Sequence, residues 1–308
     1  MTKRAAIMKK RPGTKANPGF DILVAAIGVL IAVLVAYPLY FCIIASFSSP
    51  TEVATGNTMF WIKGFTLDHY GYVFRERSLW VGYRNTVIYT LLGTIYNLVL
   101  TIPAAYVLSK RELPFKNVLL WYFLITMYIG GGIIPQYFLI KNLGLLDSPL
   151  SLIVGTGVSA SNLVITRSYF RNSIPGELYE ATWIDGGSEF RTFLHVALPL
   201  SKPITAVMAL YYGVTRWNSY YNALLFIRSD DFKPLQLVLR EILVNNQLSV
   251  LDMSTADTSS IAYMLERAQV AEGMKYAIVF IASAPLLIAF PFVQKHFTKG
   301  IMMGSVKG

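Results

Sequence analysis

Long apolar runs alternate with shorter polar segments along the chain. The apolar runs lie near residues 21–46, 84–109, 117–140, 149–171, 203–227 and 274–297. An α-helix needs about 20 such residues to cross a hydrocarbon core about 30 Å thick. The pattern therefore predicts an all-α membrane protein with six transmembrane helices.

The charges between the apolar runs predict how the helices are oriented. Lysine and arginine are concentrated at the N-terminus, in 109–116, between Arg171 and Lys202 and at the C-terminus, whereas 228–273 is net acidic. Positive residues favour the cytoplasmic side of a membrane. We therefore expect both termini and the segment 172–201 in the cytoplasm of a bacterial cell, and 228–273 on the extracytoplasmic side.

The composition agrees with this assignment. Of the 308 residues, 54% are hydrophobic and 14% are charged, whereas a soluble domain carries about a quarter charged residues. The net charge of +10 would suit a nucleic-acid-binding protein, but six lysines and arginines fall within the first 15 residues. Such a cluster is typical of a tail that faces anionic lipid. We expect a basic tail at 1–20, a transmembrane domain at 21–297 and a C-terminal tail at 298–308.

The sequence carries no pattern typical of catalysis or of a metal site. No stretch matches the phosphate-binding pattern G-x-x-x-x-G-K-[ST]. The three histidines, His69, His195 and His296, fall on separate segments, and Cys42 is the sole cysteine. One cysteine forms no internal disulfide, and no spaced Cys/His set suggests zinc. We expect no catalytic residue, cofactor or metal in this chain.

The segment "ELYEATWIDGGSEFRTFLHVALP" (177–199) predicts two short helices separated by a turn. Glu177 suits a first helical turn, Gly186 favours the left-handed conformation that ends a helix, and Ser188 can cap the next helix. We expect the second helix to run through Phe193 and to stop before Pro199. The pattern alone fits either an ordinary surface loop or a docking element for a soluble partner.

The same segment resembles the EAA loop of ATP-binding-cassette (ABC) importer permeases. The family pattern is Glu-Ala-Ala, three residues, glycine, nine residues, Ile-x-Leu-Pro; here Glu180 and Ala181 begin it, with Thr182, Gly186 and Val196 at the same spacing. Thr182 and Val196 depart from the family's alanine and isoleucine. The resemblance implies the type I importer permease fold, in which this loop forms a coupling helix that docks on an ATPase subunit. It assigns the docking contact to Glu180, Ala181, Thr182, Asp185, Gly186, Leu198 and Pro199.

The C-terminal stretch "PFVQKHFTKGIMMGSVKG" (291–308) is similar to the tail of the second permease subunit in maltose-type importers. That resemblance implies a tail that reaches between two ATPases through Gly300, Gly304 and Lys307. A solvated, frayed tail is the alternative. The implied partners are a second, different permease subunit, two ATPase subunits that hold ATP and magnesium, and an extracytoplasmic substrate-binding protein.

A broader resemblance runs along nearly the whole chain. The stretches "YPLYFCIIASFSSP", "MYIGGGIIPQYFLIKNLGLLDS" and "RWNSYYNALLFI" resemble a branch of these permeases linked with complex oligosaccharides and polysaccharide fragments. This implies uptake of such sugars by alternating access. The alternative is a self-sufficient, ion-coupled secondary transporter, which would need acidic groups inside the apolar runs; the runs contain almost none. A sensor or assembly protein, or an ABC permease for amino acids or metals, fits the pattern less well.

Polar residues within the apolar runs predict a path for the substrate. Those of 203–227 have spacings of four, three and four, which place them on one helix face: Tyr211, Thr215, Asn218 and Asn222. Trp217 and Tyr221 would offer aromatic faces to sugar rings. Asn97 and Asn162 add amides from two other runs, although bonding between helices is the alternative role. We expect Arg216 to pair within the protein rather than to meet an acidic sugar, and 228–273 to dock the binding protein.

Overall fold

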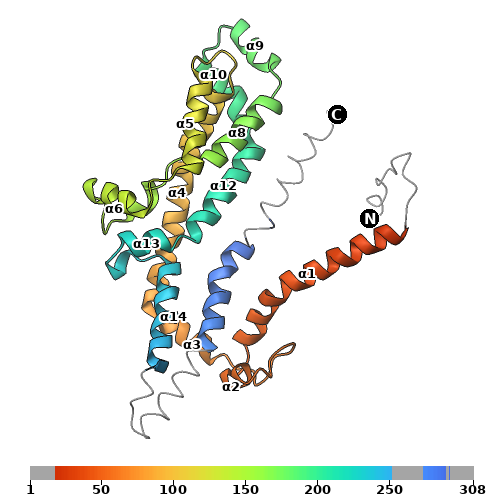
Figure 1. Ribbon diagram of the computed structural model, residues 1–308, viewed down its shortest axis with the longest axis vertical. Coiled ribbons are helices and arrows are strands. Elements are labelled where there is room, and N and C mark those ends of the chain that lie inside the picture. The colour runs from red at the N-terminus through yellow and green to blue at the C-terminus, as the bar shows by residue number, and fades with distance from the viewer. Residues whose placement is uncertain (1–17, 252–272, 289–290, 292–308) are drawn as a thin grey trace.

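The computed structural model describes residues 18–251, 273–288 and 291, and this part of the chain folds into helices and loops without a strand. Within it, α1 (Pro18–Ser46) and α4 (Arg77–Ser109) are the two single helices long and apolar enough to cross a membrane. α1 diverges from the other helices, whereas α4 lies among them (Figure 1). None of the apolar window of α1 is buried. A helix with so much apolar surface needs lipid or another protein to cover it.

α4 is the central helix of the bundle. The carboxylate of Glu76 caps its N-terminus by accepting a hydrogen bond from the backbone N–H of Ser78. Three long helices contact it: α8 (Ala160–Asn172), α12 (Lys202–Trp217) and α14 (Leu235–Leu251). Gly82 permits the close approach of α14, because a Cβ there would lie 3.0 Å from the Cα of Leu235.

Two of the expected transmembrane helices are each broken into two. The run 117–140 forms α5 (Lys116–Tyr128) and α6 (Ile133–Asn142), which are bent by 114°. Gly132 lies at this bend with φ of 79°, a conformation that glycine adopts without strain. The run 149–171 forms α7 (Pro149–Val154) and α8, separated by residues 155–159. The glycines of "GGGIIPQ" (130–136) predict a hinge or a helix end in the run 117–140, and the structure has a bend there. The expectation of one continuous helix over 149–171 is wrong.

The segment after α8 folds into a series of short helices before α12. In order, these are α9 (Glu177–Ile184), α10 (Glu189–Thr192), the π-helical turn η1 (Phe193–Ala197) and α11 (Leu198–Leu200). The stretch from Glu189 to Leu200 meets α12 at an angle of 77°. α9 and α10 therefore project together at one end of the bundle (Figure 1).

The opposite end is built from the remaining elements, several of which lie beside the lower half of α4 in Figure 1. They are α2 (Pro50–Ala54), α3 (Asp68–Arg75), α13 (Tyr221–Phe226), the 3₁₀ turn η2 (Asp230–Phe232), α14 and a helix at Gly273–Ile288. α14 (Leu235–Leu251) is the longest of these elements. Its buried Leu235, Val238 and Leu239 form an apolar core with Leu79 and Ile278.

The helix lengths support a membrane protein without fixing the number of its spans. In the described residues, two helices and two bent pairs have the length and composition to cross a membrane, and the helix at Gly273–Ile288 is apolar but shorter. The six-helix topology, its orientation and the domain boundaries therefore stay predictions.

Candidate functional site

The predicted coupling loop forms a compact helix–turn–helix. α9 is followed by Asp185 and Gly186, and Gly186 has φ of 72°, the left-handed conformation expected of it. The hydroxyl of Ser188 accepts a hydrogen bond from the backbone N–H of Arg191 at 3.3 Å, which caps α10. The predicted glycine turn and serine cap are both confirmed.

Most of the predicted docking residues are exposed. Those exposed to solvent are Glu180, Ala181, Asp185, Gly186, Leu198 and Pro199. Thr182 is half-buried, and its hydroxyl donates to the carbonyl of Leu178 at 3.0 Å. Two large apolar side chains accompany them, with Ile184 85% exposed and Phe190 71% exposed. Carboxylates beside exposed apolar side chains form a surface suited to a protein partner.

The second helix of the loop does not stop before Pro199. It continues from α10 through η1 and α11 to Leu200, so the prediction of its end was wrong. A proline removes one hydrogen bond from the regular helical ladder. The π-helical turn at 193–197 already departs from that ladder immediately before Pro199, and the chain passes the proline without ending the helix.

An aromatic cluster holds the loop on the end of α4. Tyr106 is 4% exposed, and the rings of Phe170, Tyr179 and Phe193 surround it at centroid distances of 5.8, 6.0 and 5.1 Å. Its hydroxyl donates to the Glu189 carboxylate at 2.9 Å. Aromatic pairs of this kind contribute about 0.5–1.5 kcal/mol each beyond area burial. α9, α10 and α4 therefore share one packed core.

The pKa of Tyr179 reflects how far its side chain is withdrawn from water. Desolvation, followed by the negative charge of Glu189, raises the pKa of Tyr179 to about 12. The phenol is protonated at neutral pH in any case, and the shift shows that ionisation of this buried group is disfavoured further. The sequence does not reveal this aromatic cluster, because Tyr106 and Tyr179 lie far apart in the chain and each lies in an ordinary apolar pattern.

Three of the predicted substrate-path residues lie near the C-terminal end of α12, two within the helix and one, Asn218, as its C-cap. Tyr211, Thr215 and Asn218 are exposed, whereas Met208 and Tyr212 of the same helix are buried. The Thr215 hydroxyl donates to the carbonyl of Tyr211 at 2.8 Å. These residues therefore offer a phenol, a hydroxyl and an amide near the C-terminal end of the helix.

The predicted stripe does not extend along one helix to Asn222. α12 ends at Trp217, and Asn222 lies half-buried in α13 beside the exposed Tyr221. The chain makes a turn between the two helices, where the backbone N–H of Tyr220 donates to the carbonyl of Asn218 at 3.0 Å. The expectation of a continuous helix over 203–227 is therefore wrong.

Polar groups from several helices meet at the break between α7 and α8. Nε and Nη2 of Arg216 donate to Oδ1 of Asn97 at 3.2 and 3.0 Å. The guanidinium also donates to three backbone carbonyls, those of Leu152, Ile153 and Thr156. Nδ2 of Asn97 donates to the carbonyls of Thr156 and Gly157. The expectation that Arg216 pairs within the protein is confirmed.

Two of the predicted path residues serve packing in this structure. Asn97 is 1% exposed and bonds only within the network just described. Trp217 is 6% exposed, and its Nε1 donates to the carbonyl of Ala282 at 3.2 Å. Asn162 is half-buried in the first turn of α8. Asn97 therefore forms hydrogen bonds between helices, which was the alternative to a place in the substrate path.

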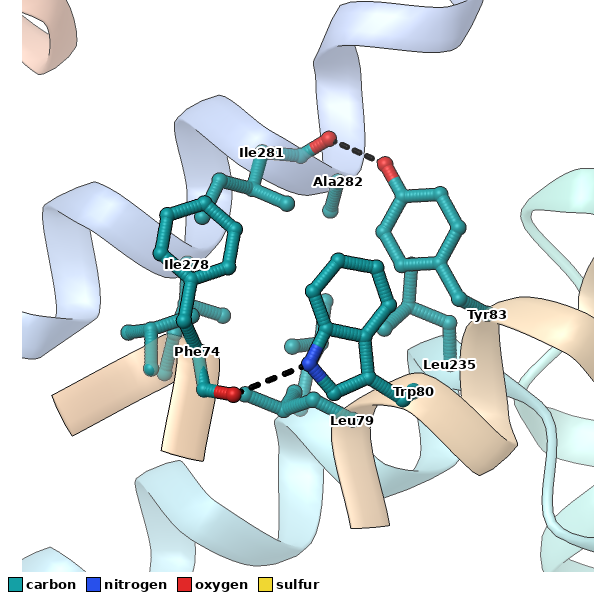
Figure 2. Close-up of a pocket in the computed structure, with 10 residues that line it drawn as sticks. Phe74, Leu79, Trp80, Tyr83, Leu235, Ile278, Ile281 and Ala282 are labelled. Carbon is teal, nitrogen blue, oxygen red and sulfur yellow. Dashed lines mark hydrogen bonds between the residues drawn. The ribbon is translucent and has the colours of Figure 1, made fainter. Parts of the chain in front are cut away.

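An apolar pocket lies where α3, α4, α14 and the helix at 273–288 meet (Figure 2). Its lining comes from α3, α4, α14 and the helix at 273–288 and includes Phe74, Leu79, Trp80, Tyr83, Leu235 and Ile278. Nε1 of Trp80 donates to the carbonyl of Phe74 at 3.0 Å, and the hydroxyl of Tyr83 donates to the carbonyl of Ile281. These polar atoms are paired with backbone, so the pocket offers a sugar few hydrogen-bonding groups.

Some predicted features fall outside the described residues. These are the tail contacts Gly300, Gly304 and Lys307 and the part of 228–273 that spans 252–272. Within the described ranges, no group of three or more His, Cys, Asp or Glu side chains could hold a metal ion.

Comparison with known proteins reveals relatives along nearly the whole chain. Protein LplC of Bacillus subtilis (strain 168) is 38% identical over 96% of this chain and 97% of its own length. The polygalacturonan/rhamnogalacturonan transport system permease protein YtcP of the same organism is 35% identical over 95% of this chain and 99% of its own length. The arabinooligosaccharides transport system permease protein AraQ of Halalkalibacterium halodurans is 27% identical over 96% and 99%.

A solved structure shares the fold. It is the crystal structure of a bacterial ABC transporter involved in the import of the acidic polysaccharide alginate, and one of its chains aligns with a TM-score of 0.80 and 28% identity. The alignment covers 94% of this chain and 100% of that one. The model of one protein family, described as binding-protein-dependent transport system inner membrane component, matches residues 78–303. With most of its length matched, from α4 onward, the chain belongs to this family of membrane components of binding-protein-dependent transport systems.

Proposed function

We propose that the chain is a permease subunit of an ABC importer that takes up oligosaccharides or polysaccharide fragments. An extracytoplasmic binding protein delivers the sugar, and ATPase subunits that hold ATP and magnesium supply the energy. This chain provides part of the membrane path and performs no ATP hydrolysis itself. Alternating access of the path to the two sides of the membrane moves the sugar inward.

The observation that carries the proposal is the exposed loop packed on the end of α4. Its outer surface bears Glu180, Asp185 and Ile184, and its inner surface packs on Tyr106. Such a loop can bind a soluble partner on one side and transmit force to a membrane helix on the other. Packed helices move as rigid bodies, so closure of the ATPases would turn α4 with the loop.

The sugar path is assigned to the exposed face near the junction of α12 and α13. Tyr211, Thr215, Asn218 and Tyr221 are exposed there, and Asn222 is half-buried. Hydroxyl and amide groups can bond to sugar hydroxyls, and polar side chains at membrane depth face protein or water rather than lipid. Asn162, near the start of α8, is assigned to the same path.

The relatives favour complex and acidic sugars. YtcP carries polygalacturonan and rhamnogalacturonan in its name, and the structural neighbour imports the acidic polysaccharide alginate. Arg216 brings a positive charge close to the proposed path, and the hydrogen bonds of its guanidinium all go to neutral acceptors. Acidic oligosaccharides are therefore the first substrates to test, with neutral ones as the comparison.

The proposed assembly explains the surfaces that the chain leaves uncovered. A second permease subunit and lipid would cover α1, whose apolar window has no buried residue. One ATPase would dock on the loop at α9 and α10, and Gly300, Gly304 and Lys307 of the tail would reach between the two ATPases. Six helices with both ends in the cytoplasm would place that loop on the ATPase side of the membrane.

Purification of the tagged chain from native membranes in mild detergent tests this function. We expect a second permease of similar length and two copies of an ATPase to accompany it, as identified by mass spectrometry. Their ATP hydrolysis should rise when the binding protein is added with an oligogalacturonide. A chain that purifies alone and still moves solute down an ion gradient in liposomes contradicts the proposal and supports the secondary transporter.

A further inference from the structure

Lys110 lies where α4 ends and the coupling loop packs. Its Nζ is 3.1 Å from a carboxylate oxygen of Glu189. The same Nζ lies 4.6 Å from the ring centroid of Tyr106, 4.3 Å from that of Tyr179 and 4.8 Å from that of Trp183. The lysine side chain is only 13% exposed. We call these five residues the Lys110 cage.

The Lys110 cage joins three elements. Tyr106 lies in α4, and Lys110 is the C-cap residue of that helix. Tyr179 and Trp183 lie in α9, and Glu189 lies in α10. Tyr179 and Trp183 are four residues apart, so one face of α9 presents both rings to the ammonium group. A cation shielded from water is attracted to ring faces more strongly than an exposed one. Nζ thus connects the two loop helices to α4.

The connections through the backbone alone would leave α9 free to pivot. Gly176 precedes it, and Gly186 follows it with φ of 72°. Glycine on both sides allows the backbone to change direction at small cost. A force applied to the exposed face of α9 would then be absorbed at these glycines, unless side chains fix the helix to its neighbours.

We propose that the Lys110 cage is the joint that makes α9, α10 and the end of α4 move as one body. The inference rests on the proposed function, in which an ATPase pushes on α9. Lys110 acts as a positioning residue, since it passes the movement to α4 without contacting ATPase or sugar. Further along α4, Asn97 holds Arg216 of α12, so the movement reaches the helix that carries the sugar path.

Substitutions at Lys110 can test the contribution of its positive charge separately from the contribution of its packing. Lys110→Met keeps a long side chain against the three rings but removes the cation, and Lys110→Arg restores it. Arg111→Met is the matched control, because it removes a positive charge from the next residue, which is exposed and outside the cage. All three variants and the wild type are purified as the full complex in lipid nanodiscs.

Amide hydrogen exchange measures the joint directly. Without nucleotide, Lys110→Met should raise exchange in 177–187 by about tenfold, the size of effect expected from losing a shielded cation–aromatic contact. With a non-hydrolysable ATP analogue and magnesium, the wild type should change exchange both in 177–187 and in 98–109. In Lys110→Met the change should remain in 177–187 and be lost in 98–109, while Lys110→Arg and Arg111→Met should behave as the wild type.

The possible results separate this inference from the proposed function. The proposed joint is contradicted if exchange in 177–187 is equal in Lys110→Met and the wild type. It is also contradicted if Lys110→Met keeps the wild-type nucleotide response in 98–109. A wild-type complex that binds no ATPase, or shows no nucleotide response in 177–187, overturns the proposed function and the transmission role together. Loss of ATPase from Lys110→Met alone also counts against the joint, because the Lys110 side chain is only 13% exposed and is not among the proposed docking residues.

Discussion

Asn97 on α4 accepts two hydrogen bonds from Arg216 on α12, from Nε at 3.2 Å and from Nη2 at 3.0 Å. Both side chains also donate to the carbonyl of Thr156, at 2.6 Å in each case, in the break between α7 and α8. Neither lipid nor an apolar neighbour can satisfy carbonyls that a broken helix leaves open. The buried charge and the broken helix are therefore parts of one arrangement, in which each stabilises the other.

Asn97→Leu should destabilise the protein, because it removes an acceptor of Arg216 and a donor to Thr156 while keeping a similar volume. An unsatisfied buried group costs about 1–3 kcal/mol, more when it is charged. We expect a lower apparent melting temperature of the purified complex, measured by intrinsic fluorescence. Asn218→Leu is the control, since Asn218 is exposed. Equal melting temperatures for the two variants would contradict the structural role of Asn97.

Gly93→Ala should disturb the hydrogen bonds between Arg216 and Asn97. A Cβ at Gly93 would lie 2.9 Å from Nε of Arg216, so the guanidinium must shift away from its acceptors. Overpacking of this kind costs about 1–3 kcal/mol. Gly28→Ala provides the comparison, because nothing lies within 4 Å of a Cβ there. We expect a lower melting temperature for Gly93→Ala than for Gly28→Ala in the same detergent, and equal values would contradict the close packing of Gly93 on Arg216.

Gly186→Ala should weaken docking of the ATPase. Gly186 has φ of 72°, and a residue with a Cβ pays about 1–2 kcal/mol in this conformation. The turn between α9 and α10 would relax and change the shape of the docking surface. Gly176→Ala is a matched control on the other side of α9, where φ is −62° and a Cβ meets nothing within 4 Å. The amount of ATPase recovered with the tagged chain should fall for Gly186→Ala alone.

Asn218→Ala and Tyr211→Ala should lower sugar uptake while leaving the complex assembled. Both side chains are exposed near the end of α12, and each offers one hydrogen-bonding group to the proposed path. A lost hydrogen bond to a sugar is worth about 0.5–1.5 kcal/mol, so we expect the KM for an oligogalacturonide to rise several-fold. Ile95→Ala, at an exposed apolar position of α4, is the control. Unchanged uptake and unchanged substrate-stimulated ATP hydrolysis in both variants would remove these residues from the path.

Asp147 should make the stability of the protein depend on pH. Its carboxylate accepts bonds from the hydroxyl and N–H of Ser229 and from the N–H of Arg228, and these bonds lower the pKa of Asp147. The stabilisation is therefore complete above the ordinary carboxyl pKa of about 3.9. It is lost as the pH falls through the lower pKa of the folded protein.

Asp147→Asn isolates this contribution. Asparagine keeps an acceptor and tolerates the left-handed backbone of this position, where φ is 53°. The difference in melting temperature between wild type and variant should be largest near pH 7 and should shrink below about pH 4. A difference that stays constant over this range would show that the charge of Asp147 contributes nothing.

The sequence predicts the coupling loop well, because local chemistry determines it. Gly186 supplies a backbone conformation that other residues avoid, and Ser188 has few roles at that position other than a cap. The exposed side chains follow from the spacing within a short helix. The aromatic core under the loop could not be predicted in this way, since Tyr106 and Tyr179 meet only after α4 and α9 have packed.

The continuity of the transmembrane helices was harder to predict. An apolar run shows that a segment suits lipid, but it does not show whether the helix inside it is continuous. The break at 155–159 depends on partners elsewhere in the chain, among them Asn97 and Arg216, whose side chains donate to the carbonyl of Thr156. Arg216 in an apolar run signalled that such partners exist, although the sequence did not identify them.

The most direct test of the account is sugar uptake by the purified complex in proteoliposomes. We predict that a labelled oligosaccharide accumulates inside only when ATP, magnesium and the binding protein are all present, and that Gly186→Ala reduces this uptake together with ATPase binding. Uptake by the chain alone, driven by a proton or sodium gradient and indifferent to ATP, would contradict the central claim.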